Sequence, residues 1–230
     1  MTYSEIRPSA ALAPWVECFW SSRDEAPDPE PHRILPDGCA DLVFDLQDGS
    51  ADVVGTMTRP LLIPAGGPSD FLGVRFRPGR AAAFLRLPLA ELTDARVPLT
   101  DVWKQWDGRL DLASLEAELL RRLDPDRDRR VDAAIARLTA GAARIEDVAS
   151  EIGISRQHLA RQFLHHVGVP PKTFARVARF RRLVEAVGER DHVDWADAAA
   201  AHGYYDQSHL ITDFRELAGT TPNAFHFSNR

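Results

Sequence analysis

Two short stretches decide the fold: residues 153 to 163 read GISRQHLARQF, and residues 203 to 214 read GYYDQSHLITDF. In each copy an alanine stands four residues before the glycine, and a His-Leu pair precedes a phenylalanine. The two glycines are 50 residues apart and the two His-Leu pairs are 51 apart. The chain therefore contains one local structural unit twice, with one extra residue after the second glycine.

The first copy predicts a helix-turn-helix. Residues 145 to 152 place apolar side chains on one helical face, Gly153 permits a sharp turn, and Ser155 is a natural N-cap for the next helix. Leu159 and Phe163 are spaced to pack back on the first helix. The side chains that then face outward are Arg156, Gln157, Ala160 and Arg161.

The second copy repeats this plan. Gly203 lies in the turn, Asp206 is the expected N-cap, and Leu210 and Phe214 point inward. Outward-facing positions are Gln207, Ser208, His209 and Thr212. Asp213 follows them, and we expect its negative charge to repel phosphate. The second helix is therefore expected to offer little net positive charge to DNA.

A long helix is predicted between the copies, over residues 170 to 190, with Pro171 near its start and Gly188 near its end. A helix of ~17 residues is ~25 Å long, which suits two recognition helices about one DNA turn (~34 Å) apart. The basic stripe on this helix is more consistent with a solvent-exposed face than with a DNA-contacting face, because a linker helix stands off the duplex. The stripe consists of Lys172, Arg176, Arg179 and Arg182.

Charge is distributed unevenly along the 230 residues. The net charge is −6, but the first 126 residues carry 13 basic and 21 acidic residues, and the remainder carries 15 and 13. Seven of the eight histidines also lie in the second half. The acidity therefore belongs to the front of the chain and does not exclude nucleic acid as a partner of the rest.

The front of the chain is predicted to be rich in strands. Twelve of the sixteen prolines precede residue 100, among short apolar runs such as residues 40 to 46 and 71 to 76. Residues 112 to 123 have leucines at helical spacing, which fits either a dimer seam or a helix packed within the chain. With a break at Asp124-Pro125-Asp126, we expect an α+β chain: a β-rich domain over residues 1 to 124 and an all-α domain over residues 126 to 230.

Residues 128 to 227 closely resemble the DNA-binding domain of the AraC family of bacterial transcription regulators, including the long central helix and the closing FRELAGTTPNAF (214 to 225). The resemblance implies promoter binding by both recognition helices. Arg161 is the best candidate for a base contact, because guanidinium–guanine pairing is the commonest specific contact. His158 and His209 each fit a DNA contact or a cap or packing role equally well. Family members often have arginine where this chain has Thr212.

The front of the chain resembles the N-terminal domain of one subgroup of these regulators. The resemblance rests on LAPWVECFW (12 to 20), RILPDGCADLVF (33 to 44), FLGVRFRPGRAAAFLRLP (71 to 88) and LTDVW (99 to 103). It implies a β-rich sensor of a small molecule and leaves the ligand unknown.

The two cysteines, Cys18 and Cys39, are expected to be free packing thiols, since they are too few for a disulfide scaffold or a four-cysteine zinc site. Together with His32 they lack a recognisable metal spacing, so neither metal nor cofactor is expected. Residues 36 to 38, Pro-Asp-Gly, predict a tight turn between strands. The aromatic side chains expected in the core are Trp15, Phe19 and Trp20.

The leading interpretation is a ligand-modulated regulator in the cytoplasm, since the sequence starts without a signal-peptide pattern and has no apolar run of about 18 residues. Expected partners are promoter DNA, RNA polymerase, a small-molecule effector and a second copy of the chain, and no membrane. Two alternatives stay open: an enzyme that carries a DNA-binding appendage, and a protein-docking module. No glycine-rich phosphate loop, GxSxG or HExxH motif supports the enzyme.

Overall fold

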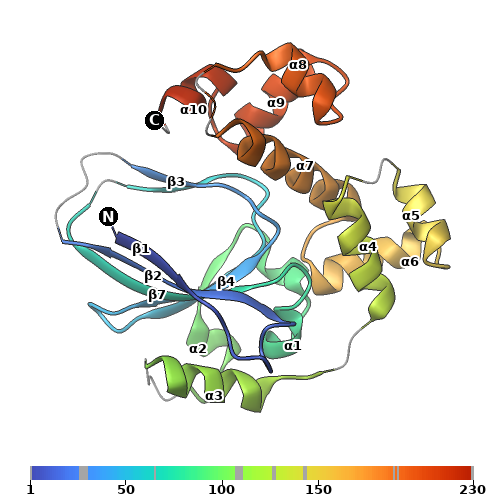
Figure 1. Cartoon of the computed structure of the whole chain (residues 1–230). Coiled ribbons are helices and arrows are strands. Elements are labelled where there is room, and N and C mark those ends of the chain that lie inside the picture. Colours follow the sequence, from blue (N-terminus) through green and yellow to red (C-terminus); the bar gives the residue numbers. More distant parts are fainter. Residues whose placement is uncertain are drawn as a thin grey trace.

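The computed structural model describes residues 2–25, 31–64, 66–106, 111–125, 128–141, 144–188, 190 and 192–228. Figure 1 shows a β-rich part in blue to green and a helical part in yellow to red. We call residues 2–125 the front part and residues 128–228 the helical part. The expected boundary at residues 124 to 126 falls partly outside the described residues. The predicted α+β class is confirmed.

The front part contains two antiparallel sheets. The larger has six strands in the order β1 (Thr2–Ile6), β2 (Val16–Asp24), β7 (Ser69–Phe76), β4 (Ala40–Asp45), β5 (Ala51–Val54) and β8 (Arg96–Pro98). The smaller pairs β3 (His32–Ile34) with β6 (Leu61–Ile63). In Figure 1 this narrow ribbon lies between the larger sheet and the end of the helical part.

One face of the larger sheet forms the core of the front part. Along β4 the side chains of Ala40, Leu42 and Phe44 alternate with partly exposed ones, as a strand with one buried face requires. Helical segments cover that face: α1 (Ala82–Leu85), η1 (Leu89–Leu92), α2 (Leu99–Val102) and α3 (Leu112–Arg122). Leu115 and Leu119 of α3 are fully buried in this core, so these two leucines pack within the chain, while Leu120 stays exposed.

One expectation for the front part needs correction. Trp15 and Phe19 are in the core, but Trp20 lies on the opposite face of the sheet, where its Nε1 donates to Asp41 at 2.9 Å. Residues 36 to 38 lie between two strands as expected, and these strands, β3 and β4, belong to different sheets. The connection is a bend, with Gly38 at φ +81°.

The helical part has two hydrophobic cores that share one helix. Its elements are α4 (Arg129–Thr139), α5 (Ile145–Glu151), α6 (Arg156–His166), α7 (Pro171–Val187), α8 (Trp195–Ala201), α9 (Gln207–Leu217) and α10 (Pro222–Ser228). Phe174 of α7 belongs to the core of α4–α6, and Phe180 and Leu183 belong to the core of α8–α10. The 17 residues of α7 therefore connect the two units.

Both predicted helix-turn-helix units are present. Gly153 and Gly203 have φ values of +71° and +74°, which glycine adopts without the steric cost of a Cβ. The Ser155 hydroxyl accepts from the backbone N–H of His158 at 3.1 Å, and the Asp206 carboxylate accepts from that of His209 at 2.7 Å. These N-caps begin α6 and α9 at the residues expected from the sequence.

The front part is bonded to the end of α6. The hydroxyls of Thr56 and Thr93 donate to the backbone carbonyls of Val167 and Gly168, each at 2.6 Å. Val167 is the C-cap of α6, whose last carbonyls lack partners within the helix. A Cβ at Gly168 would approach the Leu89 carbonyl oxygen to 3.0 Å, so the chain passes close to η1 here. Side chains of the front part thus fix the end of a helix in the helical part.

Replacing Thr56 with valine tests this connection. Thr56 is 2% exposed, and valine keeps its shape but deprives a buried carbonyl of its donor. We expect the free energy of unfolding to fall by about 1–3 kcal/mol, measured by urea denaturation. The matched control is Thr100→Val on α2, where the side chain is exposed. Equal losses in both variants would show that the Thr56 bond does not join the two parts.

Candidate nucleic-acid interface

The first candidate reading surface consists of three exposed side chains in the first two turns of α6: Arg156, Gln157 and Arg161. Ala160 is half-buried beside them, while Leu159 and Phe163 are fully buried in the core below. Arg161 Nη2 lies 3.0 Å from His158 Nδ1, so the half-buried histidine steadies the arginine. Arg156 is paired with Glu146 of α5 at 2.6 Å. Among the described residues, no carboxylate forms an ion pair with Arg161.

The second candidate reading surface consists of three exposed side chains in the first two turns of α9: Gln207, Ser208 and Thr212. The hydroxyl of Thr212 donates to the Ser208 carbonyl at 3.0 Å, one helical turn back. The hydroxyl hydrogen of Thr212 is therefore bonded within the helix. The first two turns of α9 thus present one amide and one hydroxyl as their main donors, and the basic side chain of this helix, the exposed Arg215, lies in the last turn.

His209 has a packing role. Its Nδ1 accepts from the backbone N–H of Tyr205 at 3.4 Å, and its Nε2 lies 3.1 Å from Arg179 Nη2. Its ring also stands edge-on to the ring of Tyr204, with centroids 5.2 Å apart. These contacts hold the imidazole against α7, so of the two roles open from the sequence the structure favours packing.

Asp213 does not face outward, contrary to expectation. It is 1% exposed, and its two carboxylate oxygens accept from Arg176 Nε at 2.6 Å and from Arg179 Nη2 at 2.9 Å. The predicted repulsion of phosphate by this residue is wrong, because the charge is buried between α9 and α7 and is compensated there. Asp213 instead fixes the second recognition helix on the connecting helix.

The basic stripe of α7 is neither a free solvated face nor a DNA track. Arg176 and Arg179 bind Asp213, and Arg182 donates to the Thr139 carbonyl at the end of α4. Lys172 stays exposed. Burial lowers the pKa of Arg176, but the hydrogen bond and charge of Asp213 more than offset this, so the pKa lies above its usual value. The arginines of α7 thus hold both units in place.

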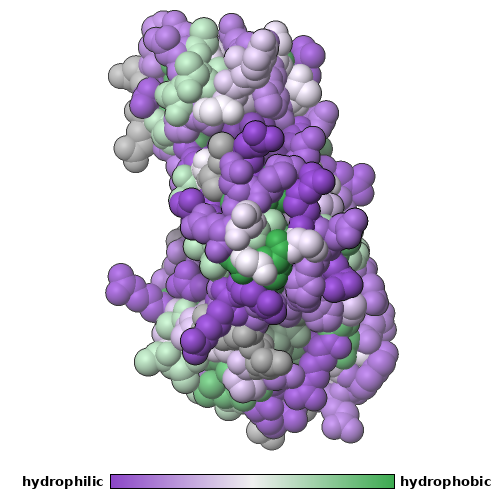
Figure 2. All heavy atoms as spheres, turned by 90° about the vertical axis from the view of Figure 1, so that its right-hand side faces the viewer, coloured by the Kyte–Doolittle hydropathy of each residue, from purple (hydrophilic) through white to green (hydrophobic). Residues whose placement is uncertain are grey.

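The face of the molecule that carries the helical units is mostly hydrophilic. Figure 2 looks onto the right-hand side of Figure 1 and shows polar side chains over most of that face, with separate apolar areas near the top, at mid-height and at the lower left. Protein-docking surfaces usually have a larger apolar centre. The visible face is better suited to a polar partner.

Comparison with known families matches the helical part directly. A helix-turn-helix domain model matches residues 148–226. This part of the chain is an AraC-type helix-turn-helix domain. Residues 4–98 match a domain of unknown function (DUF6597). Among curated proteins, none matches the sequence.

Several solved structures resemble the chain at low identity. A transcriptional regulator of Chromobacterium violaceum with an AraC-type DNA-binding domain is 19% identical; the match covers 44% of this chain and 92% of that one, with a TM-score of 0.41. ToxT from Vibrio cholerae is 12% identical, with 91% and 98% covered and a TM-score of 0.46. ToxT with a bound unsaturated fatty acid is also 12% identical, with 91% and 95% covered and a TM-score of 0.46.

The AraC-type domain contains functional candidates that the sequence did not single out. Tyr205 is 93% exposed and stands directly before the N-cap Asp206, at the end of α9 that a groove-binding helix presents to DNA. The sequence signal for Tyr205 was the second turn, which is one residue longer than the first. The bonds of Arg176 and Arg179 to Asp213 span 34 to 37 residues, and no local pattern indicates such a pairing.

Both cysteines are buried free thiols. Burial raises the pKa of Cys18 to about 11 and also raises that of Cys39, so neither is a reactive thiolate near neutral pH. Within the described ranges, His32 and the cysteines are not part of a group that could hold a metal ion. In the same ranges no helix combines the length and apolarity needed to cross a bilayer.

Asp213→Asn tests the buried ion pair of the AraC-type domain. Removing one partner of a buried pair leaves a poorly compensated charge, and we expect a loss of about 3 kcal/mol in unfolding free energy. Glu216→Gln is the matched control, because Glu216 pairs with the same Arg176 but is 56% exposed. An exposed pair contributes about 0–1 kcal/mol. Denaturant unfolding of the two variants measures these losses of unfolding free energy. Similar losses in both variants would contradict a buried ion pair at Asp213.

Proposed function

We propose that this chain is a sequence-specific transcription regulator that binds promoter DNA through α6 and α9 and senses a small molecule in its front part. The observation that carries the proposal is the shared helix α7. It belongs to the cores of both helix-turn-helix units and holds α9 through Asp213. Two recognition helices on one helix can enter successive major grooves of the same duplex.

Side-chain chemistry supports direct reading of bases by the first surface. The planar guanidinium of Arg161 matches the two acceptors of guanine, and the amide of Gln157 matches the donor and acceptor of adenine. On the second surface Gln207 and Ser208 have the corresponding donors, and the exposed phenol of Tyr205 lies within the same helix end. We assign most of the sequence preference to α6, because the first two turns of α9 contain no arginine and its Arg215 lies in the last turn.

Charge supports local binding to DNA by a chain that is acidic overall. The negative excess lies in the first 126 residues, and the remainder is slightly basic. Phosphates near α6 and α9 thus meet the part of the chain with the more favourable charge. The proposal also includes a cytoplasmic location, contact with RNA polymerase and pairing of two copies of the chain.

Selection from a random duplex pool with the full chain tests the proposal. We expect one enriched sequence, whose logarithmic affinity falls linearly with the logarithm of the salt concentration as counterions are released. Gel shifts at a series of salt concentrations measure this. Failure to enrich any sequence, or affinity independent of salt, would contradict DNA reading and favour the protein-docking alternative.

Arg161→Ala is expected to relax the preference at one or two base pairs of the selected site. A good bidentate contact discriminates by about 1–3 kcal/mol, so binding to the selected duplex should weaken and binding to point-mutated duplexes should change little. Arg137→Ala is the matched control, because Arg137 is also exposed but lies on α4, paired with Glu151. Equal effects of the two substitutions would argue against a base contact by Arg161.

A further inference from the structure

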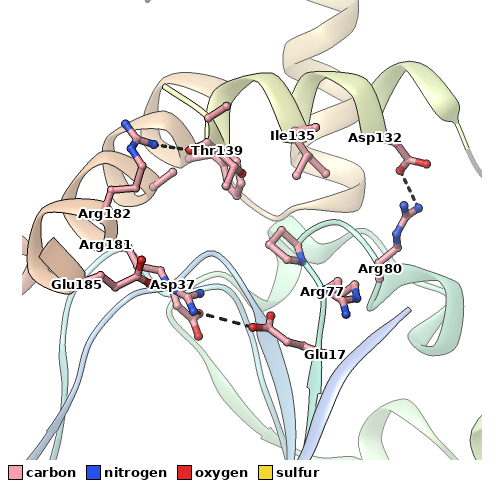
Figure 3. A pocket seen from close by; sticks show the side chains of 15 residues that line it. Glu17, Asp37, Arg77, Arg80, Asp132, Ile135, Thr139, Arg181, Arg182 and Glu185 are labelled. Carbon is pink, nitrogen blue, oxygen red and sulfur yellow. Dashed lines mark hydrogen bonds and ion pairs between the residues drawn. The ribbon is translucent and has the colours of Figure 1, made fainter. Parts of the chain in front are cut away.

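A cleft of about 580 Å³ lies between the front part and the helical part. Figure 3 shows α4 above it, α7 to one side, and β2 with the following loops below. Its walls come from both parts, and its volume is in the range of small-molecule sites. The cleft is bounded at one end by the ion pair of Arg80 with Asp132 at 2.7 Å and at the other by Arg181.

The upper wall of the cleft is mainly apolar. Figure 3 shows Ile135 projecting from α4 into the cleft. Phe174 and Ala178 of α7 and Pro78 of the front part complete an apolar lining. A ligand with an apolar body would bury its surface here.

The lower wall, in contrast, is charged, with carboxylates on the side next to α7 and with Arg77 and Arg80 further along (Figure 3). Glu17 and Asp37 line the cleft, and Asp41 lies behind them. Arg75 is shared by Asp37 at 3.5 Å and Asp41 at 3.4 Å. The nearest described cation to Glu17 is Arg181 at 3.9 Å, a distant pair.

The remaining cations of the cleft already have close partners. Arg181 binds Glu185 of its own helix at 2.8 Å, which satisfies it without Glu17. Arg77 donates to the Ala13 carbonyl, and Arg182 donates to the Thr139 carbonyl. None of these bonds compensates Glu17.

Neighbouring groups respond to this negative potential. Burial and then the charges of Asp37, Glu17 and Asp41 raise the pKa of Cys39. Burial raises the pKa of Asp41 to about 6 even though Arg75 lowers it, and Asp37 contributes to the rise. The lower wall thus favours positive charge.

We propose that this cleft binds a small organic cation with an apolar body, such as an aromatic or alkyl amine. The ammonium group would lie between Glu17 and Asp37, and the apolar body would contact Ile135, Phe174 and Ala178. The ligand replaces Arg181 as the partner of Glu17, and Arg181 keeps its bond to Glu185. If the proposed regulatory function holds, this exchange links ligand binding to α7, which connects both recognition helices.

Three probes that share a phenyl ring test the ligand class on the full chain without DNA. Calorimetric titration is expected to show binding of 2-phenylethylammonium at one site, with the neutral 2-phenylethanol and the anionic 3-phenylpropanoate at least about ten-fold weaker. Equal affinity for the three, preference for the anion, or no binding of the ammonium would overturn the proposal.

Variants then locate the site. Glu17→Gln should weaken ammonium binding about ten-fold, and Arg181→Gln should strengthen it, because a competing cation is removed. Ala136→Phe, at an exposed position of α4 that lines the cleft, should block binding without removing a core contact. The exposed Glu91→Gln is the control. Unchanged binding in Ala136→Phe would place the ligand elsewhere.

The result can be separated from the test of DNA reading. A chain that binds its selected duplex but no amine contradicts only the ligand assignment. Binding of the amine by a chain that enriches no duplex contradicts only the regulatory proposal. Where both bind, the amine is expected to change the affinity for the duplex in a gel shift.

Discussion

One helix must satisfy two hydrophobic cores at once, and the rest of the helical part depends on that constraint. The first turn of α7 contributes Phe174 to one core, and the following turns contribute Phe180 and Leu183 to the other. Because both sets lie on the same rigid helix, a shift of α7 that improved one core would disturb the other. The buried bonds of Asp213 to Arg176 and Arg179 add a polar constraint to the same helix.

The front part contacts this arrangement through more than one kind of chemistry. At the end of α6, two hydroxyl groups donate to backbone carbonyls and the chain passes close to η1 at Gly168. Along α4 and α7 the front part borders a cleft between ion pairs, and beside it Gly38 and Gly79 pass close to Phe174 and Ile135: an added Cβ would lie 2.8 Å and 2.5 Å from these side chains. The cleft is thus flanked by close contacts between the two parts.

Local sequence signals predicted the local structure well. The caps Ser155 and Asp206 and the turn glycines act through atoms within a few residues, so their pattern is readable in the sequence. Asp213 was misplaced because a carboxylate is expected in solvent unless a partner is known, although its spacing from Leu210 and Leu217 places it on the inward face of the helix. Its partners lie 34 and 37 residues away, and only the packing of α9 on α7 brings them together. Trp20 was misplaced for a similar reason: the irregular pairing of β2 between Val16 and Cys18 changes which residues face the core.

The unequal outer faces of α6 and α9 give the molecule a direction. Arg156, Gln157 and Arg161 occupy one end of the pair, and Gln207, Ser208 and Thr212 occupy the other, in an order fixed by the covalent chain. Under the proposed function, a duplex matched to this pair is neither a simple repeat nor a palindrome within one chain's footprint. Inverting such a site would turn the whole protein around, so the front part would lie upstream in one orientation and downstream in the other. Even a single bound copy would therefore distinguish the two directions along the DNA.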